Sequence, residues 1–371
     1  MKHAKLSASG SPGWLGCPGS VSAQEQYPDT GSSIYALEGT RAHELADKCL
    51  KTNKEAVSFV GKKIMGEKIE KDMARYVQQY LDYVSSHEST TTDLYTEERV
   101  DFSNIVPGGF GTLDAAVVDS DTGICHIFDL KYGRGVQVYS KDNTQAQLYC
   151  LGMLNEYGWL GVITRFRIHI VQPRKVTPDP WDISVEDLEK FGQYATQQAN
   201  IALAPGAPRV PGEKQCQWCR AKGDCEQLAS FVEETISAEF DDLDDVTVPG
   251  ISDARKKAII DNKKFIEDFL NAVEDSVFSD MLNGGEFEGY KLVEGRSNRQ
   301  WTEDAEAVLK SALKSKAYNT KLIGIGAAEK LLGKDELEAI THKPEGKPTL
   351  ARDSDRRVAI STDVTKDFDK I

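Results

Sequence analysis

Two spacings of apolar side chains alternate along the first two thirds of the chain. Apolar residues recur every three to four positions in four segments, which predicts amphipathic helices at residues 36–50, 68–86, 143–157 and 185–203. Four further segments alternate or are apolar throughout, which predicts strands at residues 94–102, 111–118, 124–132 and 165–172. The order of helices, strands, helix, strand and helix predicts an α/β fold in which helices flank a mixed central sheet.

The flanking regions show weaker patterns. Residues 1–35 are rich in Gly, Ser and Pro, so we expect a loosely structured lead-in. The acidic stretch at residues 239–245 suggests a boundary, and the pattern beyond it predicts a long helix, a strand and a helix at residues 252–282, 287–293 and 302–313. From residue 343 the chain has Pro, Gly and charge without periodicity, which predicts an extended or disordered tail. We therefore predict three parts: a core of residues 1–235, a mostly helical accessory region of residues 236–342, and a tail of residues 343–371.

Composition narrows the classes of protein that fit. The 371 residues are 40% hydrophobic and 28% charged, as in globular proteins, and no apolar run approaches the 18 or so residues of a membrane span. The net charge of −14 argues against a basic protein that coats nucleic acid, although it leaves room for a local basic groove. The first 21 residues lack the apolar core of a secretory signal, so we expect a cytoplasmic protein without disulfides.

The seven cysteines fall into two groups. Three lie in apolar periodic stretches and are expected to be small core residues: Cys49, Cys125 and Cys150. The second group includes Cys216, Cys219 and Cys225, which form a C-x2-C-x5-C motif in a segment rich in Gly, Lys and Gln. Thiolates clustered in this way indicate a soft metal ion or an iron–sulfur cluster.

A tetrahedral centre needs a fourth ligand, and Cys17 is the best candidate. It lies in a turn-like Gly-Cys-Pro-Gly setting, unlike the cysteines of the apolar stretches. Together with Cys216 it would close a loop of about 200 residues, and simple loop-closure entropy makes such a link worth roughly 5 kcal/mol. A zinc site in which Cys17 takes no part is the alternative, and the spacing alone does not decide between zinc and a cluster.

Two acidic residues border neighbouring predicted strands. A short hairpin can bring Asp114 beside Asp129, and the two-residue period of a strand puts Asp129 and Lys131 on one face. Two carboxylates and the backbone carbonyl of Leu130 are oxygen ligands suited to Mg²⁺ or Mn²⁺. Lys131 can then orient or deprotonate a water that attacks a phosphodiester. A surface hairpin that carries an ordinary Asp–Lys ion pair is the alternative.

Two predicted helices supply further polar side chains. His43 and Asp47 share one helix face, where a neutral imidazole can bind a metal ion or donate to a phosphate. Gln145 and Tyr149 lie one turn apart on another helix and can position a phosphate or a base. Each pair also fits a purely structural role.

Taken in chain order, these residues resemble the RecB-type branch of the PD-(D/E)XK nucleases. The set comprises His43, the G-T-L-D segment ending at Asp114, the D-L-K segment ending at Lys131 and the Q-x3-Y segment ending at Tyr149. One early cysteine followed by a late C-x2-C-x5-C resembles the iron–sulfur version of that branch, which occurs in CRISPR-associated RecB-like exonucleases and in AddAB-type helicase–nucleases. The whole chain is also similar to a phage and prophage family defined as a domain of unknown function, through residues 38–43, 289–301 and 347–350.

The resemblance implies a restriction-endonuclease-like core and a role for each residue. The implied ligands of Mg²⁺ or Mn²⁺ are His43, Asp114, Asp129 and the carbonyl of Leu130. Lys131 would position or activate water, Gln145 and Tyr149 would contact DNA or steady the site, and Glu98 would be a weaker candidate for an extra acid. A [4Fe–4S] cluster that joins the ends of the nuclease domain would be held by four cysteines: Cys17, Cys216, Cys219 and Cys225.

We therefore expect a metal-dependent DNA exonuclease that acts in phage replication or recombination inside the bacterial host cytoplasm. Its substrate would be single-stranded or double-stranded DNA ends, and its partners would be phage recombination or single-strand-annealing proteins. The sequence has no G-x4-G-K-[ST] loop, so unwinding of DNA would need another protein. The alternative is a non-catalytic module that binds DNA ends or docks a partner while keeping the nuclease fold.

Overall fold

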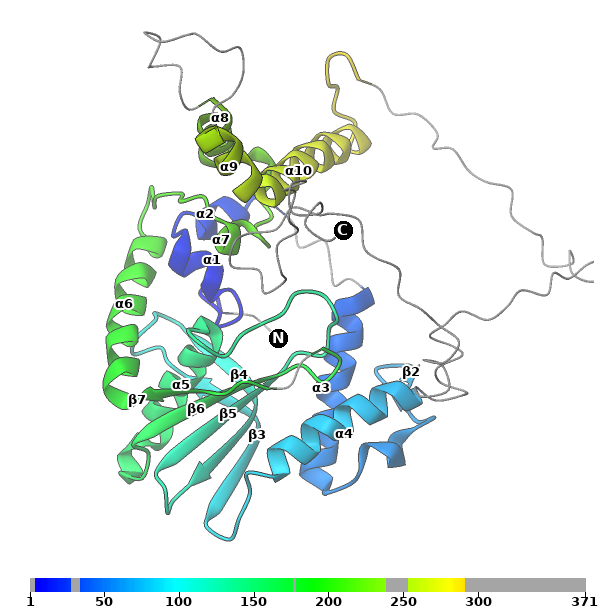
Figure 1. Ribbon diagram of the computed structural model, residues 1–371, viewed down its shortest axis with the longest axis vertical. Helices are drawn as coiled ribbons and strands as arrows, with labels where there is room; N and C mark the ends of the chain where they lie inside the picture. The colour runs from blue at the N-terminus through cyan, green and yellow to red at the C-terminus, as the bar shows by residue number, and fades with distance from the viewer. Residues whose placement is uncertain (1–3, 28–33, 176–177, 238–252, 291–371) are drawn as a thin grey trace, which may run out of the picture. The chain divides into compact units, whose positions relative to one another are not determined.

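The computed structural model describes residues 4–27, 34–175, 178–237 and 253–290 (Figure 1). The chain divides into two compact units, Met1–Leu292 and Val293–Ile371, and every described residue belongs to the first. The predicted part boundaries after residues 235 and 342 remain predictions. The predicted helix at residues 302–313 and the predicted tail from residue 343 lie outside the described residues.

A five-stranded mixed sheet forms the centre of the first unit. Its strands lie side by side in chain order: β3 Thr92–Asp101, β4 Phe110–Asp119, β5 Ile124–Leu130, β6 Arg165–Val171 and β7 Trp181–Ser184 (Figure 1). Neighbouring strands are antiparallel except β5 and β6, which are parallel because helix α5 (Thr144–Tyr157) crosses between them. Every residue of β5 is buried, as expected for a central strand with helices on both faces.

Helices α5 and α6 (Val185–Leu203) cover one face of the sheet. Ile127 of β5 belongs to the same hydrophobic cluster as Leu148 of α5. Helix α5 begins where the sequence supplies a cap, since the side chain of Asn143 accepts the backbone N–H of Ala146 at 3.0 Å. These contacts fix the register of α5 against the strand that carries the predicted acids.

Helices α3 (Ile34–Thr52) and α4 (Lys71–Ser85) cover the opposite face. Phe128 and Leu130 of β5 belong to the same hydrophobic cluster as Leu45 of α3. Since side chains of a strand alternate between faces, neighbouring residues of β5 serve two separate cores. The predicted α/β fold with helices on both sides of a mixed sheet is confirmed. The predicted core cysteines are buried: Cys49, Cys125 and Cys150.

The beginning of the chain carries more secondary structure than its composition predicts. Residues 4–27 contain the short helices α1 (Ser11–Gly16) and α2 (Ser20–Gln24), so the expected loosely structured lead-in is wrong for this stretch. Trp14 and Leu15 are only 3% and 5% exposed and pack into the cluster beneath α5 and α6. Two well-buried apolar side chains outweigh the helix-breaking composition around them.

The long helix predicted at residues 252–282 is two helices. These are α9 (Asp253–Asp261) and α10 (Lys263–Leu282), which follow α8 (Glu226–Ser237). The break falls at Asn262, whose side-chain amide donates to the carbonyl of Ala258 at 3.0 Å. An asparagine that bonds nearby backbone in this way competes with the helical hydrogen bonds, which explains the correction.

The strand predicted at residues 287–293 is wrong in its described part, residues 287–290. There the N–H of Tyr290 donates to the carbonyl of Phe287 at 3.1 Å, and Gly289 has a φ of 82°. A turn of this kind needs a positive φ, which glycine adopts without steric cost. The rest of the predicted strand lies outside the described residues.

The remaining elements are too short to show a period. They are η1 Ala56–Phe59, β1 Lys63–Ile64, β2 Glu67–Lys68, η2 Gly158–Leu160, α7 Glu213–Cys216 and η3 Lys222–Asp224. Strand β7 was not predicted because it too is short, with only four residues. Among the described residues, no helix is both long enough and apolar enough to cross a membrane.

Candidate active site

Two aspartates meet where β4 and β5 end their ladder. The last pair of that ladder is Ala115 with Phe128, so the next residues along the two strands, Asp114 and Asp129, lie side by side. The side chain of Asp114 is 17% exposed and that of Asp129 is 6% exposed. The hairpin therefore places two carboxylates together, with most of their surface removed from water.

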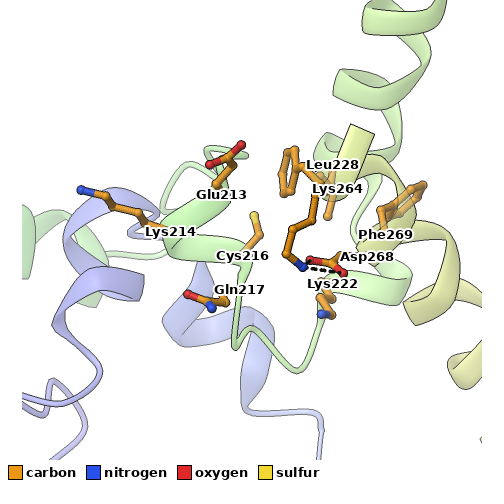
Figure 2. A pocket seen from close by; sticks show the side chains of 10 residues that line it. Glu213, Lys214, Cys216, Gln217, Lys222, Leu228, Lys264, Asp268 and Phe269 are labelled. Carbon is orange, nitrogen blue, oxygen red and sulfur yellow. Dashed lines mark hydrogen bonds and ion pairs between the residues drawn. The ribbon is translucent and has the colours of Figure 1, made fainter. Parts of the chain in front are cut away.

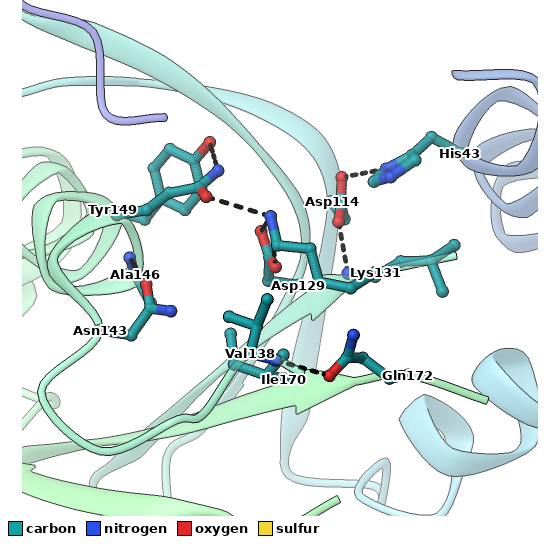
Figure 3. Close-up of polar contacts among 12 residues, drawn as sticks. His43, Asp114, Asp129, Lys131, Val138, Asn143, Ala146, Tyr149, Ile170 and Gln172 are labelled. Atoms are coloured by element: carbon teal, nitrogen blue, oxygen red, sulfur yellow. Dashed lines mark hydrogen bonds and ion pairs between the residues drawn. The ribbon is translucent and has the colours of Figure 1, made fainter. Parts of the chain in front are cut away.

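Asp114 joins helix α3 to the end of β5 (Figure 3). Its Oδ1 lies 2.7 Å from Nδ1 of His43, and its Oδ2 accepts the backbone N–H of Leu130 at 2.7 Å. Burial disfavours the imidazolium form, but the Asp114 carboxylate outweighs this effect and raises the pKa of His43. Leu130, which was predicted to act through its carbonyl, is held here by its amide nitrogen.

A chain of hydrogen bonds connects β5 to helix α5 (Figure 3). Nζ of Lys131 donates to Oδ1 of Asp129 at 3.1 Å and to Oε1 of Gln145 at 3.1 Å. Nε2 of Gln145 in turn donates to the hydroxyl of Tyr149 at 2.9 Å. The amide of Gln145 therefore fixes the position of the ammonium group, and Tyr149 fixes the orientation of the amide.

Lys131 is a cation in this arrangement. Burial disfavours the ammonium form, but the carboxylates of Asp129 and Asp114 outweigh it and raise the pKa of Lys131. The side chain thus acts as a fixed positive charge and hydrogen-bond donor. It offers no free lone pair with which to take a proton.

Asp129 carries an oxygen without an aligned hydrogen bond. Its Oδ2 is buried and lies 2.8 Å from Nζ of Lys131, but the geometry is not that of a hydrogen bond. Burial raises the pKa of Asp129, the Lys131 ammonium opposes this effect, and the neighbouring Asp114 reinforces it. A buried carboxylate that pairs with Lys131 and lies beside a second acid has lone pairs left with which to bind a further cation.

Glu97 is an acidic residue of the site that sequence reasoning missed. The pairs Thr96–Ala115 and Glu98–Leu113 place Glu97 opposite Asp114. Ligand atoms of Glu97, Asp114 and His43 lie within 4.8 Å of one another. Glu98, the neighbour favoured from the sequence, instead accepts the hydroxyl of Tyr157 at 3.1 Å.

Glu97 has an unusual backbone φ angle and an unusual side-chain pKa. Its φ is 47°, which a residue with a side chain adopts rarely. Burial raises the pKa of Glu97 to about 7, and the carboxylates of Asp114 and Asp47 add to the effect. Asp47 lies one turn from His43 and pairs with Lys51 at 2.8 Å. The sequence of β3 alone does not show which of its residues faces Asp114. Glu97 could have been predicted only if the register between β3 and β4 were known.

The residues present fit a hard divalent cation. The donor set is one imidazole and several carboxylate oxygens, with Asp129 Oδ2 unaligned and Glu97 pushed toward protonation by its acidic neighbours. Mg²⁺ and Mn²⁺ prefer oxygen donors, and a double positive charge would relieve the repulsion among these acids. This structure therefore brings together His43, Asp114, Asp129, Lys131, Gln145 and Tyr149, and adds Glu97.

Four cysteines line one small cavity between the N-terminal helices and α7. They are Cys17, Cys216, Cys219 and Cys225. The backbone N–H of Val210 donates to Sγ of Cys17 at 3.2 Å, and that of Gly212 donates to Sγ of Cys216 at 3.5 Å. Hydrogen bonds to sulfur are a common feature of iron–sulfur sites, so the residues present fit such a group.

Helix α10 packs against Cys216, one of the four cysteines. Cys216 belongs to the same hydrophobic cluster as Phe265 and Phe269 of α10, and it borders a hollow of about 190 Å³ beside that helix (Figure 2). Burial raises the pKa of Cys216 to about 11. The free thiol therefore stays protonated at neutral pH, and a bound metal would have to displace its proton.

Residues 3–358 match the family described as "Protein of unknown function (DUF2800)", and the chain belongs to that family. One similar solved structure is that of a putative exonuclease from Eubacterium rectale, which is 14% identical, with 67% of this chain and 90% of that chain covered and a TM-score of 0.32. Another is that of SSO0001, which is 15% identical, with coverages of 55% and 91% and a TM-score of 0.24. At these values neither similarity bears on function.

Proposed function

We propose that this protein is a metal-dependent deoxyribonuclease of the RecB-like PD-(D/E)XK type. One observation carries the proposal. Helices α3 and α5, strands β4 and β5 and the residue after β5 supply five side chains at one end of the β4–β5 ladder. One contact joins His43 to Asp114, and a second group of contacts joins Asp129, Lys131 and Gln145. Their order along the chain is the order of the motifs in that nuclease branch.

The metal ligands would be His43, Asp114, Asp129 and the carbonyl of Leu130, with Glu97 as an additional carboxylate close to the first two. When bound, Mg²⁺ or Mn²⁺ supplies a Lewis acid that polarises a phosphoryl oxygen. The hydrogen bond from Leu130 to Asp114 and the contact of Asp114 with His43 hold these donors in place. These contacts fix the side chains of His43 and Asp114 relative to each other before an ion binds.

Lys131, Gln145 and Tyr149 would act on the reacting groups by position and charge. The ammonium of Lys131 orients the attacking water and stabilises the negative charge that develops on the phosphate. Gln145 holds that ammonium through its Oε1, and Tyr149 holds Gln145. Because Lys131 stays protonated beside Asp129, we assign it orientation and charge stabilisation and not proton removal.

The four cysteines would hold a [4Fe–4S] cluster that joins both ends of the nuclease core. All four cysteines line one cavity in the described part of the chain, which supports a single centre with four thiolate ligands. Either a [4Fe–4S] cluster or zinc can take such ligands. The motif order shared with the iron–sulfur branch favours the cluster.

We further propose that the substrate is a DNA end and that digestion is exonucleolytic, in phage replication or recombination in the bacterial cytoplasm. Recombination or single-strand-annealing proteins would be the partners. This part of the proposal rests on the motif order shared with RecB-like exonucleases.

Variants in the site test the activity. With Mg²⁺ or Mn²⁺, the full chain should degrade end-labelled linear DNA and leave covalently closed circular DNA intact. Asp129→Asn and Lys131→Gln should each lower the rate by roughly 100-fold or more, since each removes a charge that acts on the transition state. Asp119→Asn, at the other end of β4, is the matched control and should cut at the wild-type rate.

Two other results would contradict the proposal. Equal rates for wild type and Asp129→Asn would place the activity elsewhere. Binding of DNA ends without cleavage under both metals would select the alternative, a non-catalytic module that keeps the nuclease fold.

A further inference from the structure

Three of the six histidines of the chain gather on the other face of the sheet. His126 lies on β5, His169 lies on β6, and His87 lies just after the last turn of α4. Strand alternation puts His126 on the same side as Phe128 and therefore on the face opposite Asp129. Ligand nitrogens of the three imidazoles lie within 4.8 Å of one another.

The contacts with Tyr83 turn the inner nitrogens of two histidines toward the cluster. Nδ1 of His87 lies 2.8 Å from the carbonyl of Tyr83, so it must carry the proton, and Nε2 keeps the lone pair. Nδ1 of His169 lies 2.9 Å from the hydroxyl of Tyr83, which leaves its Nε2 directed at His126. One residue of α4 thus orients both rings from behind, as outer partners do for the histidines of metal sites.

The distance between the two innermost nitrogens also fits an ion. Nδ1 of His126 lies 3.0 Å from Nε2 of His169. Two nitrogens on tetrahedral zinc stand about 3.3 Å apart, given Zn–N bonds of about 2.0 Å. The two nitrogens share one proton, which Nδ1 of His126 carries. When an ion takes its place, His126 carries its proton on Nε2 instead.

The surroundings favour neutral imidazoles, and only His87 is partly exposed to solvent among the three. The ring of Phe128 stacks on the imidazole of His169 with 4.5 Å between centroids. The ring of Tyr83 meets the imidazole of His169 edge-on, with 5.5 Å between centroids. His169 is fully buried and His126 is 7% exposed, while His87 is partly exposed. Burial among aromatic rings disfavours the charged imidazolium, and ligation needs the neutral form.

We propose that His87, His126 and His169 bind one Zn²⁺ ion, separate from the site at Asp114 and Asp129. Three imidazoles are a known ligand set for zinc, and nitrogen donors select zinc over Mg²⁺. The ion would fasten the end of α4 to the two parallel strands β5 and β6. This site does not depend on the proposed nuclease activity.

Zinc binding to the metal-stripped full chain tests the proposal. Beside any Zn²⁺ that the four cysteines take up, a competition titration against a chromophoric chelator should give one further equivalent that His87→Gln loses, with affinity lower by roughly 100-fold or more. Tyr83→Phe should keep the stoichiometry and lose roughly 10-fold to 100-fold in affinity, as outer partners of metal ligands do. His43→Gln is the matched control, because it alters the other candidate metal site and should keep this equivalent.

A second measurement keeps the result interpretable. In the histidine-labelled full chain, Zn²⁺ should shift the imidazole nitrogen resonances of His87, His126 and His169 together. His87→Gln should still cut DNA with Mg²⁺ at the wild-type rate, so a failure here is distinct from a failure of the nuclease proposal. Unchanged zinc affinity in folded His87→Gln, or nitrogen shifts confined to other histidines, would overturn the site.

Discussion

At the scale of single residues, the candidate site holds more negative charge than the chain neutralises. Ligand atoms of Asp114 and Glu97 lie within 4.8 Å of each other, and Asp129 is the neighbour of Asp114 on the adjacent strand. Lys131 contacts Asp129 directly, and His43 contacts Asp114 directly. Burial and mutual repulsion raise the pKa of Glu97 to about 7 and raise that of Asp129 as well. Such a cluster costs folding free energy unless protons or a cation compensate it.

Because of Glu97, the free energy of unfolding should depend on pH. A carboxyl whose pKa rises on folding from 4.5 to about 7 contributes stability below pH 4.5 that is lost as the pH rises through about 7. We therefore expect metal-free Glu97→Gln to lose less stability than wild type between pH 5 and pH 8. Thermal unfolding midpoints at both pH values measure this, with Glu98→Gln as the matched control. Parallel curves for wild type and Glu97→Gln would contradict the assignment.

Gln145 should behave as a positioning residue. Gln145→Leu keeps the side-chain volume and removes the contacts with Lys131 and Tyr149. We expect kcat to fall roughly 10-fold to 100-fold with little change in KM, because a misplaced group slows the chemical step. Steady-state kinetics on linear DNA measure this, and Gln193→Leu, an exposed glutamine on α6, is the control. A change in KM alone would indicate a role in DNA binding.

Local sequence patterns predicted the contacts of the candidate site that lie within one element. They did not predict the residues that are brought in from distant segments. Alternation along one strand put Asp129 beside Lys131, and helical spacing put Gln145 beside Tyr149; both pairs contact each other. Glu97 was missed because neither strand's sequence determines the register between β3 and β4. The histidine cluster was missed for the same reason, since its members come from three separate elements.

At the scale of elements, periodicity predicted the long helices and central strands because each buries one regular face. The short helix that holds Trp14 was missed, since its burial depends on α5 and α6 and not on a repeating pattern. The break at Asn262 was missed because a single side-chain bond to the backbone sets it. Elements fixed by tertiary contact are those that the sequence alone did not reveal.

Strand β4 and helix α5 approach each other closely at a glycine. A Cβ on Gly111 would come within 2.6 Å of the Tyr149 ring. Gly111→Ala should therefore displace that ring, cost about 1–3 kcal/mol of unfolding free energy and lower the cleavage rate through Gln145. Urea unfolding and cleavage assays measure both effects. Gly133→Ala, where a Cβ meets nothing within 4 Å, is the control, and equal behaviour of the two variants would contradict the packing argument.

At the scale of the whole molecule, the cysteine cavity connects segments that are distant in sequence. Cys17 follows α1, whereas Cys216 lies about 200 residues further on, and both line the same cavity. A bound cluster would therefore close a long loop and stabilise the folded chain by roughly 5 kcal/mol in a simple entropy model. The free thiols alone supply no such link.

This link predicts different outcomes for two buried cysteines. In anaerobically purified protein, Cys17→Ala should lose absorbance at about 400 nm and unfold at a lower temperature. Cys49→Ala, a buried thiol in the α3–α4 core, should keep the absorbance. Absorbance and bound iron measure the outcome. Stoichiometric zinc without iron in the wild type would favour the zinc alternative.

The most direct test of the central claim is a metal-removal experiment on the wild-type chain with end-labelled linear DNA. We expect release of labelled nucleotides with Mg²⁺ or Mn²⁺, none after chelation with EDTA, and full recovery when the metal is restored, because the acids bind the ion reversibly. Cleavage that persists in EDTA, or DNA binding without cleavage at any metal concentration, would contradict the account.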